Sequence, residues 1–177
     1  ADKLRTQVTS INQGVSNGNS AIALLQIADK SMAEQSKILD TVKSKLIQAN
    51  TDTTSADGRE AIRKDITKLL TQLDNIAVQT NYNGTNLLQS SRVANTTLTS
   101  LTFQVGENSG DTISTSAIRA NTSGYGLAAL KALTTGGLTQ ASAASNQTLV
   151  DTAITTLNGY RGDIGSTQNQ VESAVRN

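Results

Sequence analysis

The chain has 177 residues, a formal net charge of +1, and no His, Cys, Pro or Trp. Without His and Cys it lacks the commonest metal ligands, thiol chemistry and the usual general base near neutral pH, and it forms no disulfide. The small net charge, with only one Phe and three Tyr, gives little attraction or stacking for nucleic acid. We therefore expect a structural protein without a cofactor rather than an enzyme, although carboxylate and hydroxyl chemistry stays open.

Polar uncharged residues dominate, since Thr, Ser, Asn and Gln make up 71 of the 177 positions. The length suits one domain, whose core must be built from Leu, Ile, Val and Ala because aromatic residues are scarce. The sequence contains no run of about 18 apolar residues, so we expect no membrane span. Its N-terminus also lacks a signal-peptide pattern. The first residue already lies inside an amphipathic pattern, so we expect a fragment that is trimmed at both ends.

A hydrophobic residue or Gly recurs every seven positions in the first part of the chain. The positions are Leu4, Ile11, Gly18, Leu25, Met32, Leu39 and Leu46. The repeat predicts one helix over residues 4–49, packed in a coiled-coil-like seam. At 1.5 Å per residue it would be roughly 65 Å long, which predicts a rod rather than a compact globule. Residues 16–20 (SNGNS) are its weak point, because Gly and Asn disfavour helix interiors, and a kink, a close helix approach or a break all stay open.

A polar loop over residues 50–55 separates this helix from a second one. Asp57 with Glu60 three residues later resembles a capping box, which predicts that the helix starts there. Apolar residues then recur at spacings of four and three, which predicts a narrow seam docked on the first helix. They are Ile62, Ile66, Leu69, Leu73 and Ile76. We expect residues 81–84 (NYNG) to end the helix, because Asn and Gly accept the left-handed conformation.

The apolar period changes to two in the middle of the chain. Leu101, Phe103 and Val105 alternate with polar residues, and residues 107–110 (ENSG) have the composition of a turn. This pattern predicts a β-hairpin within residues 98–118 that must lean on the helices, because isolated hairpins are marginal in water. Loops over residues 121–126 and 134–137 flank a short apolar stretch over residues 127–133.

A last helix is predicted over residues 141–176. Its seam positions are Val150, Ala153, Leu157, Tyr160, Ile164, Thr167, Val171 and Ala174. The predicted fold class is therefore mainly α: an elongated bundle of three long amphipathic helices with a small β-hairpin region.

Four segments of the chain resemble those of one protein family. They are residues 15–35 (VSNGNSAIALLQIADKSMAEQ), residues 73–77 with 82–88 (LDNIA and YNGTNLL), residues 103–106 with 110–113 (FQVG and GDTI), and residues 163–169 (DIGSTQN). They are similar, in the same order, to the first long helix, the second-helix end with its turn, the hairpin and the C-terminal helix of bacterial flagellins. The resemblance covers nearly the whole chain.

The resemblance implies a structural subunit of the bacterial flagellar filament that self-assembles for motility. It implies that residues 1–89 form the N-terminal helical part of a rod domain, residues 90–140 its hairpin and loop region, and residues 141–177 its C-terminal helix. The core seam of this rod would consist of Leu4, Ile11, Leu25, Met32, Leu39, Leu46, Ile62, Ile66, Leu69, Leu73, Ile76, Leu157, Tyr160, Ile164 and Val171.

The resemblance also implies where the protein works and what it binds. The subunit would be extracellular, exported by the flagellar export apparatus without a cleaved signal peptide. Its partners would be other copies in a helical homopolymer and an export chaperone that binds a C-terminal segment beyond this chain, with no nucleic acid, membrane or cofactor. Two alternatives stay open: a hook–filament junction (hook-associated) protein, and a flagellin-like surface adhesin that binds glycans.

One segment departs from the common flagellin pattern. Many flagellins carry the sequence LQRVRELAVQ, which engages a flagellin-sensing Toll-like receptor, where this chain reads LDTVKSKLIQ at residues 39–48. Thr41, Ser44 and Lys45 replace the Arg, Glu and Leu of that pattern, so anchors of the interface are lost or reversed. The segment is similar to that of the receptor-evading flagellins of the Campylobacter and Helicobacter group, so we expect weak or no receptor activation. The candidate receptor and subunit-interface residues are Asp40, Thr41, Lys43, Ser44, Lys45 and Gln48.

Three further motifs have simpler interpretations. Residues 161–163 spell Arg-Gly-Asp, but they fall in a heptad-patterned helix, whereas integrin ligands need an exposed loop. Asn83, Asn95, Asn121 and Asn146 match the N-glycosylation pattern, which a chain so rich in Asn, Ser and Thr produces by chance. A basic patch of Lys43, Lys45, Arg63, Lys64 and Lys68 is less probable than ordinary surface charge.

Overall fold

The computed structural model describes residues 18–90 and 98–176, which form a bundle of three long helices with two short hairpins. The elements are α1 (Gly18–Ala49), α2 (Ala56–Gln79), β1 (Asn81–Tyr82), β2 (Thr85–Asn86), β3 (Thr102–Gln104), β4 (Thr112–Ser114), α3 (Ala128–Lys131) and α4 (Gln140–Arg176). The predicted mainly α, elongated class is confirmed. Within the described ranges no helix is long and apolar enough to cross a membrane.

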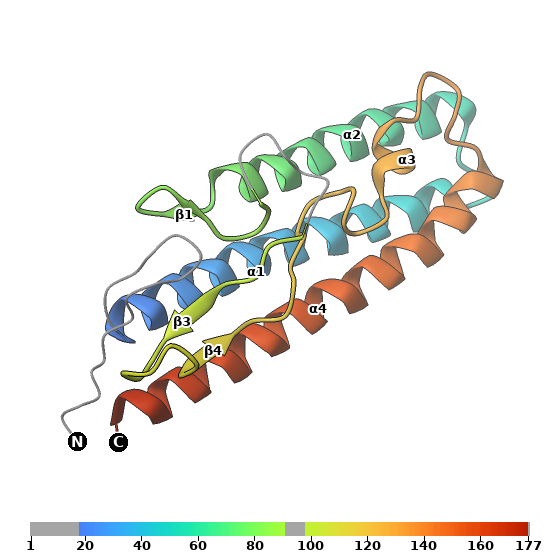
Figure 1. Ribbon diagram of the computed structural model, residues 1–177. Coiled ribbons are helices and arrows are strands. Elements are labelled where there is room, and N and C mark those ends of the chain that lie inside the picture. The colour runs from blue at the N-terminus through green and yellow to red at the C-terminus, as the bar shows by residue number, and fades with distance from the viewer. Residues whose placement is uncertain (1–17, 91–97, 177) are drawn as a thin grey trace.

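Helix α1 lies between α2 and α4 and packs against both, and the β3–β4 hairpin lies along α4 (Figure 1). The buried residues of α1 include two adjacent pairs, Leu24 with Leu25 and Ile38 with Leu39. Two neighbouring side chains on a helix point about 100° apart. The pairs therefore widen the apolar stripe of α1, so that it can pack against two partner helices. The predicted first helix reaches back to residue 4, but residues 4–17, including Leu4 and Ile11, lie outside the described ranges.

The start of α2 corrects one prediction. Ser55, not Asp57, is the N-cap: its backbone is extended (φ −74°, ψ 165°) and its Oγ accepts a hydrogen bond from Gly58 N at 3.0 Å. Asp57 lies in the first helical turn, where its charge favours the helix dipole. Glu60 does not reach back to the cap, because its carboxylate binds Arg63 and the backbone of Gly136.

The buried stripe of α2 also differs from the predicted seam. Leu70 and Ala77 are buried with Ile62, Ile66 and Leu73, whereas the predicted Leu69 and Ile76 are half-buried at the edge. A strict alternation of four and three assumes a repeat of 3.5 residues, but a straight α-helix has 3.6 residues per turn. The buried face therefore drifts from Leu69 to Leu70 and from Ile76 to Ala77.

The end of α2 was predicted at the right place for the wrong reason. Thr80 caps the helix in an extended conformation, and its N–H donates to Ile76 O at 3.0 Å. The left-handed residues Asn83 (φ 52°) and Gly84 (φ 83°) form instead the tip of the small β1–β2 hairpin. Strands of two residues are too short for the alternation that would reveal them in a sequence.

The predicted hairpin within residues 98–118 is confirmed. Strands β3 and β4 are antiparallel, with Phe103 opposite Ile113, and an isolated bridge joins Thr99 to Ile118. Phe103 is fully buried, and Ser116 N donates to the Asp163 carboxylate of α4 at 2.7 Å. The hairpin is therefore held by the helical core, as its small size requires.

A polar group lies in the middle of this core. The Gln35 side chain is fully buried, and its Nε2 donates to Leu73 O at 3.2 Å and to Ala120 O at 2.8 Å. Its Oε1 accepts a hydrogen bond from the Tyr125 hydroxyl at 2.8 Å. The next residue after Leu73 is Asp74, whose carboxylate accepts hydrogen bonds from Thr122 N and Oγ1. The two side chains connect α1, α2 and the segment that precedes α3.

Replacing Gln35 by Leu should destabilise the chain, because it removes one hydrogen bond from each of two buried carbonyls and from the buried Tyr125 hydroxyl. We expect the free energy of unfolding, measured by urea titration with circular dichroism, to fall by about 1–3 kcal/mol. The matched control is Gln26→Leu, which makes the same exchange at an exposed position of α1 and should change stability by less than about 0.5 kcal/mol. Equal effects of the two variants would contradict a structural role for the Gln35 amide.

Candidate functional site

The predicted receptor and subunit-interface residues lie on the outer side of α1. Asp40, Thr41, Ser44 and Gln48 are exposed and share one face of the helix. The Thr41 hydroxyl donates to Lys37 O at 3.1 Å, so it is turned along its own helix. This face is available for contact with another molecule.

The remaining two predicted residues flank this face and bind neighbouring helices. Lys43 Nζ lies 2.5 Å from the Asp151 carboxylate of α4, and Lys45 Nζ lies 3.2 Å from Asp65 Oδ2 of α2. Each lysine side chain is about a third exposed and each aspartate about half exposed, so each pair contributes little to the free energy of folding. Together, however, the pairs tie both edges of the α1 outer face to the adjacent helices.

A shallow groove runs between α1 and α2 beside this face. It has a volume of about 320 Å³ and is lined by Thr41, Lys45, Asp65, Lys68 and Leu69. Lys45 and Lys68 therefore come together at the groove, and Asp65 offsets part of their charge. The less probable alternative of a basic patch does not form as one surface, because Lys43 lies at the edge of α1 that faces α4 and Arg63 is paired with Glu60.

Most of the predicted core seam is in the interior. The buried members are Leu25, Met32, Leu39, Leu46, Ile62, Ile66, Leu73, Leu157, Ile164 and Val171. Leu69, Ile76 and Tyr160 are half-buried, and the Tyr160 ring lies 6.1 Å from that of Tyr125. Sequence reasoning missed Gln35, although its position three residues after Met32 places it on the same buried face.

The Arg-Gly-Asp triplet is engaged within the chain. Arg161 donates to both carboxylate oxygens of Asp29 in α1, at 2.9 and 3.2 Å, and Asp163 accepts the bond from Ser116. Both charged groups lie on a helix and already have partners, which supports the interpretation that they are structural.

The matches to the glycosylation pattern differ in accessibility. Asn121 and Asn146 are buried, whereas Asn83 is exposed at the tip of the β1–β2 hairpin. Asn95 lies outside the described residues. The structure therefore leaves Asn83 as the accessible one among the described matches.

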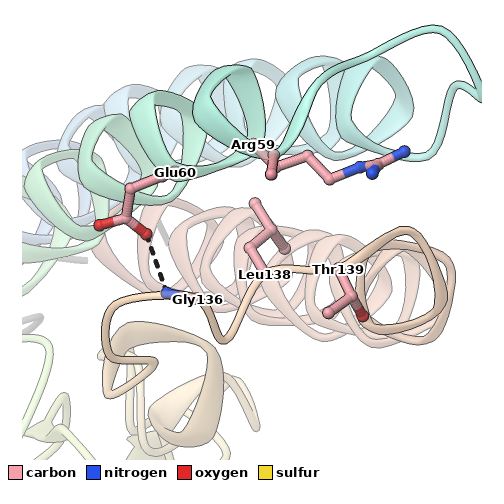
Figure 2. Close-up of a pocket in the computed structure, with 6 residues that line it drawn as sticks. Arg59, Glu60, Gly136, Leu138 and Thr139 are labelled. Atoms are coloured by element: carbon pink, nitrogen blue, oxygen red, sulfur yellow. Dashed lines mark hydrogen bonds between the residues drawn. The ribbon is translucent and has the colours of Figure 1, made fainter.

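A second, smaller pocket of about 140 Å³ lies between the first turn of α2 and the loop before α4 (Figure 2). Figure 2 shows Glu60 reaching across it to Gly136, whose N–H donates to Glu60 Oε1 at 3.2 Å. Arg63 donates to both oxygens of the same carboxylate, at 2.7 and 2.6 Å, and also to Leu133 O. Arg59 donates to Ala49 O and Thr51 O.

The polar side chains of this pocket therefore make hydrogen bonds that hold the neighbouring loops to α2. The pKa of Glu60 is lowered from 4.5 to about 2, mainly by the hydrogen bonds from Arg63; burial opposes this shift, and the hydrogen bond from Gly136 N–H adds to it. Within residues 18–90 and 98–176, no group of three acidic side chains could hold a metal ion. We interpret the pocket as a structural joint rather than as a site of chemistry.

Because the pKa of Glu60 is lower in the folded chain than in the unfolded chain, its ionised form stabilises the fold. This contribution is fully present above pH 4.5 and is lost as the pH falls towards about 2. Glu60→Gln should therefore be less stable than the wild type at pH 7, and the difference in midpoint of thermal unfolding should shrink across that acidic range. Glu34→Gln, at an exposed position of α1, is the control. A difference that stays constant from neutral to acidic pH would contradict the assigned role.

Comparisons with known proteins agree with this architecture. The family model described as the bacterial flagellin N-terminal helical region matches residues 1–93. Flagellin B of Helicobacter pylori is 42% identical over 116 residues, which are 66% of this chain and 21% of that protein. Flagellin of Clostridium tyrobutyricum is 30% identical over 128 residues, which are 72% of this chain and 34% of that protein.

The fold is similar to that of a solved structure as well. The crystal structure of Bacillus cereus flagellin matches with a TM-score of 0.74 and 28% identity, over 90% of this chain and 86% of that one. The chain spans about a fifth of the length of the Helicobacter flagellins it matches. Since the family model covers more than half of the sequence, the chain belongs to the bacterial flagellin family.

Proposed function

We propose that this chain is part of a structural subunit of the bacterial flagellar filament, which lies outside the cell and assembles from copies of itself. The observation that carries the proposal is the flagellin family match over residues 1–93, which includes α1 and α2 of the three-helix rod. The rod is stiffened on both sides of α1 by buried apolar stripes and by ion pairs between helices.

The surface of the rod suits repeated contacts between subunits. A contact between two different faces of the same molecule, repeated by a rotation and a translation, generates an open helical filament. The exposed side of α1 mixes both charge signs, with Lys30, Glu34, Lys37 and Asp40, whereas the exposed side of α4 around residues 152–159 is uncharged and polar. These faces can form hydrogen bonds with neighbours without the large apolar patches that cause aggregation.

The proposal also includes the route of export and the binding of a chaperone. The flagellin resemblance supports export through the flagellar apparatus without a cleaved signal peptide, and an export chaperone that binds a C-terminal segment of the whole protein. The core seam and the interface residues on α1 are likewise proposed from the resemblance and from their burial and exposure.

Electron microscopy of the complete gene product, seeded with filament fragments, tests the proposal. We expect long filaments from the complete protein, because a propagating subunit offers its repeated contacts to every copy that joins. The 177-residue chain is the comparison sample, and it should show no growth if assembly needs segments beyond it. Short caps or no growth from the complete protein would contradict a propagating flagellin and would favour a junction protein or a surface homologue.

We also propose that this protein activates the flagellin-sensing Toll-like receptor weakly. Thr41 and Ser44 are exposed where the common pattern has Arg and Glu, and Lys45 is held by Asp65 where that pattern has Leu. Reporter cells that carry the receptor should respond weakly, and the triple variant Thr41→Arg, Ser44→Glu, Lys45→Leu should respond more strongly. Cells without the receptor are the control. A strong response to the unaltered chain at nanomolar concentration would overturn this proposal.

A further inference from the structure

The tip of the β1–β2 hairpin carries an Asn-Gly dipeptide in an open position. Asn83 and Gly84 are both exposed, and both have left-handed backbones, with φ of 52° and 83°. Apart from its two chain neighbours, no described residue lies within 4 Å of a Cβ placed on Gly84, so the space on that side of the turn is open. That nitrogen makes one long hydrogen bond, to Asn81 Oδ1 at 3.3 Å.

Asn-Gly is the dipeptide in which a backbone nitrogen most easily attacks the preceding side chain, because Gly adds no steric hindrance and permits the required backbone rotation. From this chemistry and the exposed turn we infer that Asn83 is a site of spontaneous deamidation. The Gly84 nitrogen loses its proton and forms a bond to Asn83 Cγ, and the Cγ–Nδ2 bond breaks as ammonia leaves. Water then opens the five-membered imide at either carbonyl, giving aspartate or isoaspartate with no change in oxidation state.

The chain contains an internal comparison for this inference. Asn158 and Gly159 form the same dipeptide, Asn158 is also exposed, and a Cβ on Gly159 would likewise meet nothing within 4 Å. They lie in the interior of α4, where the Gly159 N–H belongs to the helical ladder of hydrogen bonds. Attack there requires opening of the helix, whereas at Asn83 it requires movement of a turn closed by two residue pairs. A third Asn-Gly, at residues 17–18, begins outside the described ranges.

The two products should affect the hairpin differently. Aspartate accepts a left-handed backbone nearly as well as asparagine, so it adds a negative charge and keeps the turn. Isoaspartate inserts a methylene group into the main chain between the paired residues Tyr82 and Thr85, so the two-residue turn no longer closes in register. Either product lowers the formal net charge of the chain from its value of +1 by one unit.

The test is a time course of the folded chain in mildly alkaline buffer, with residue-level mass spectrometry and enzymatic quantification of isoaspartate. We expect Asn83 to convert at least about tenfold faster than Asn158 in the folded chain, and the two rates to converge in concentrated urea. Asn83→Gly is the matched variant, because Gly accepts the same backbone conformation but has no amide to lose. It should abolish the isoaspartate signal of the hairpin and leave that of Asn158 unchanged.

Equal rates at Asn83 and Asn158 in the folded chain would overturn the inference. So would conversion of both residues in urea with no conversion of Asn83 in the folded chain, since the turn would then protect the amide. Neither result depends on whether the protein assembles into filaments, so this inference and the proposed function fail independently.

Discussion

The fold depends on one constraint, which is that α1 must bury two sides at once. Helices α2 and α4 both pack on α1, so its apolar stripe has to be wider than the stripe of a helix with a single partner (Figure 1). Leu24 next to Leu25, and Ile38 next to Leu39, supply this width. The small residues Ala21, Ala28 and Ala49 are also fully buried, which lets the helices approach closely without aromatic side chains. The scarcity of Phe, Tyr and Trp is therefore compatible with a dense core.

A stripe of aliphatic residues holds helices together but does not by itself fix how they slide along one another. Gln35 supplies that information, because its amide is satisfied only when Leu73 of α2 and Ala120 and Tyr125 of the following segment are all in place. A buried amide with every hydrogen bond made adds directional contacts at a small net cost, whereas a shifted register would leave several buried groups unpaired. The Glu60–Arg63 pair similarly fixes the loop around Gly136 against the N-terminal part of α2.

Much of this architecture could be predicted from the sequence, because a long amphipathic helix gives a hydrophobic period that persists over many turns. The prediction failed where local geometry decides between neighbours. Leu69 and Leu70 are equally apolar, and only the true helical period shows that Leu70 faces the core. Ser55 and Asp57 are both good caps, and the choice follows from the backbone at Ser55. Asn83–Gly84 signals a left-handed turn, but the sequence does not say whether that turn ends a helix or closes a hairpin.

The outer face of α1 was proposed as an interface from the flagellin resemblance, but the contacts of its side chains could not be predicted from the sequence of α1 alone. Lys45 stands where the common flagellin pattern has an apolar residue, and it contacts Asp65, which lies twenty positions further along the chain. Lys43 likewise depends on Asp151 of α4. A departure from the family pattern at these positions therefore changes two things together: the side chains exposed on the outer face of α1, and the ion pairs that join α1 to its neighbours. For the same reason a substitution at Lys45 cannot alter the surface without also altering the α1–α2 contact. Thr41 and Ser44 are exposed and uncharged, so substitutions there break no ion pair between helices, although Thr41 lines the groove beside α2.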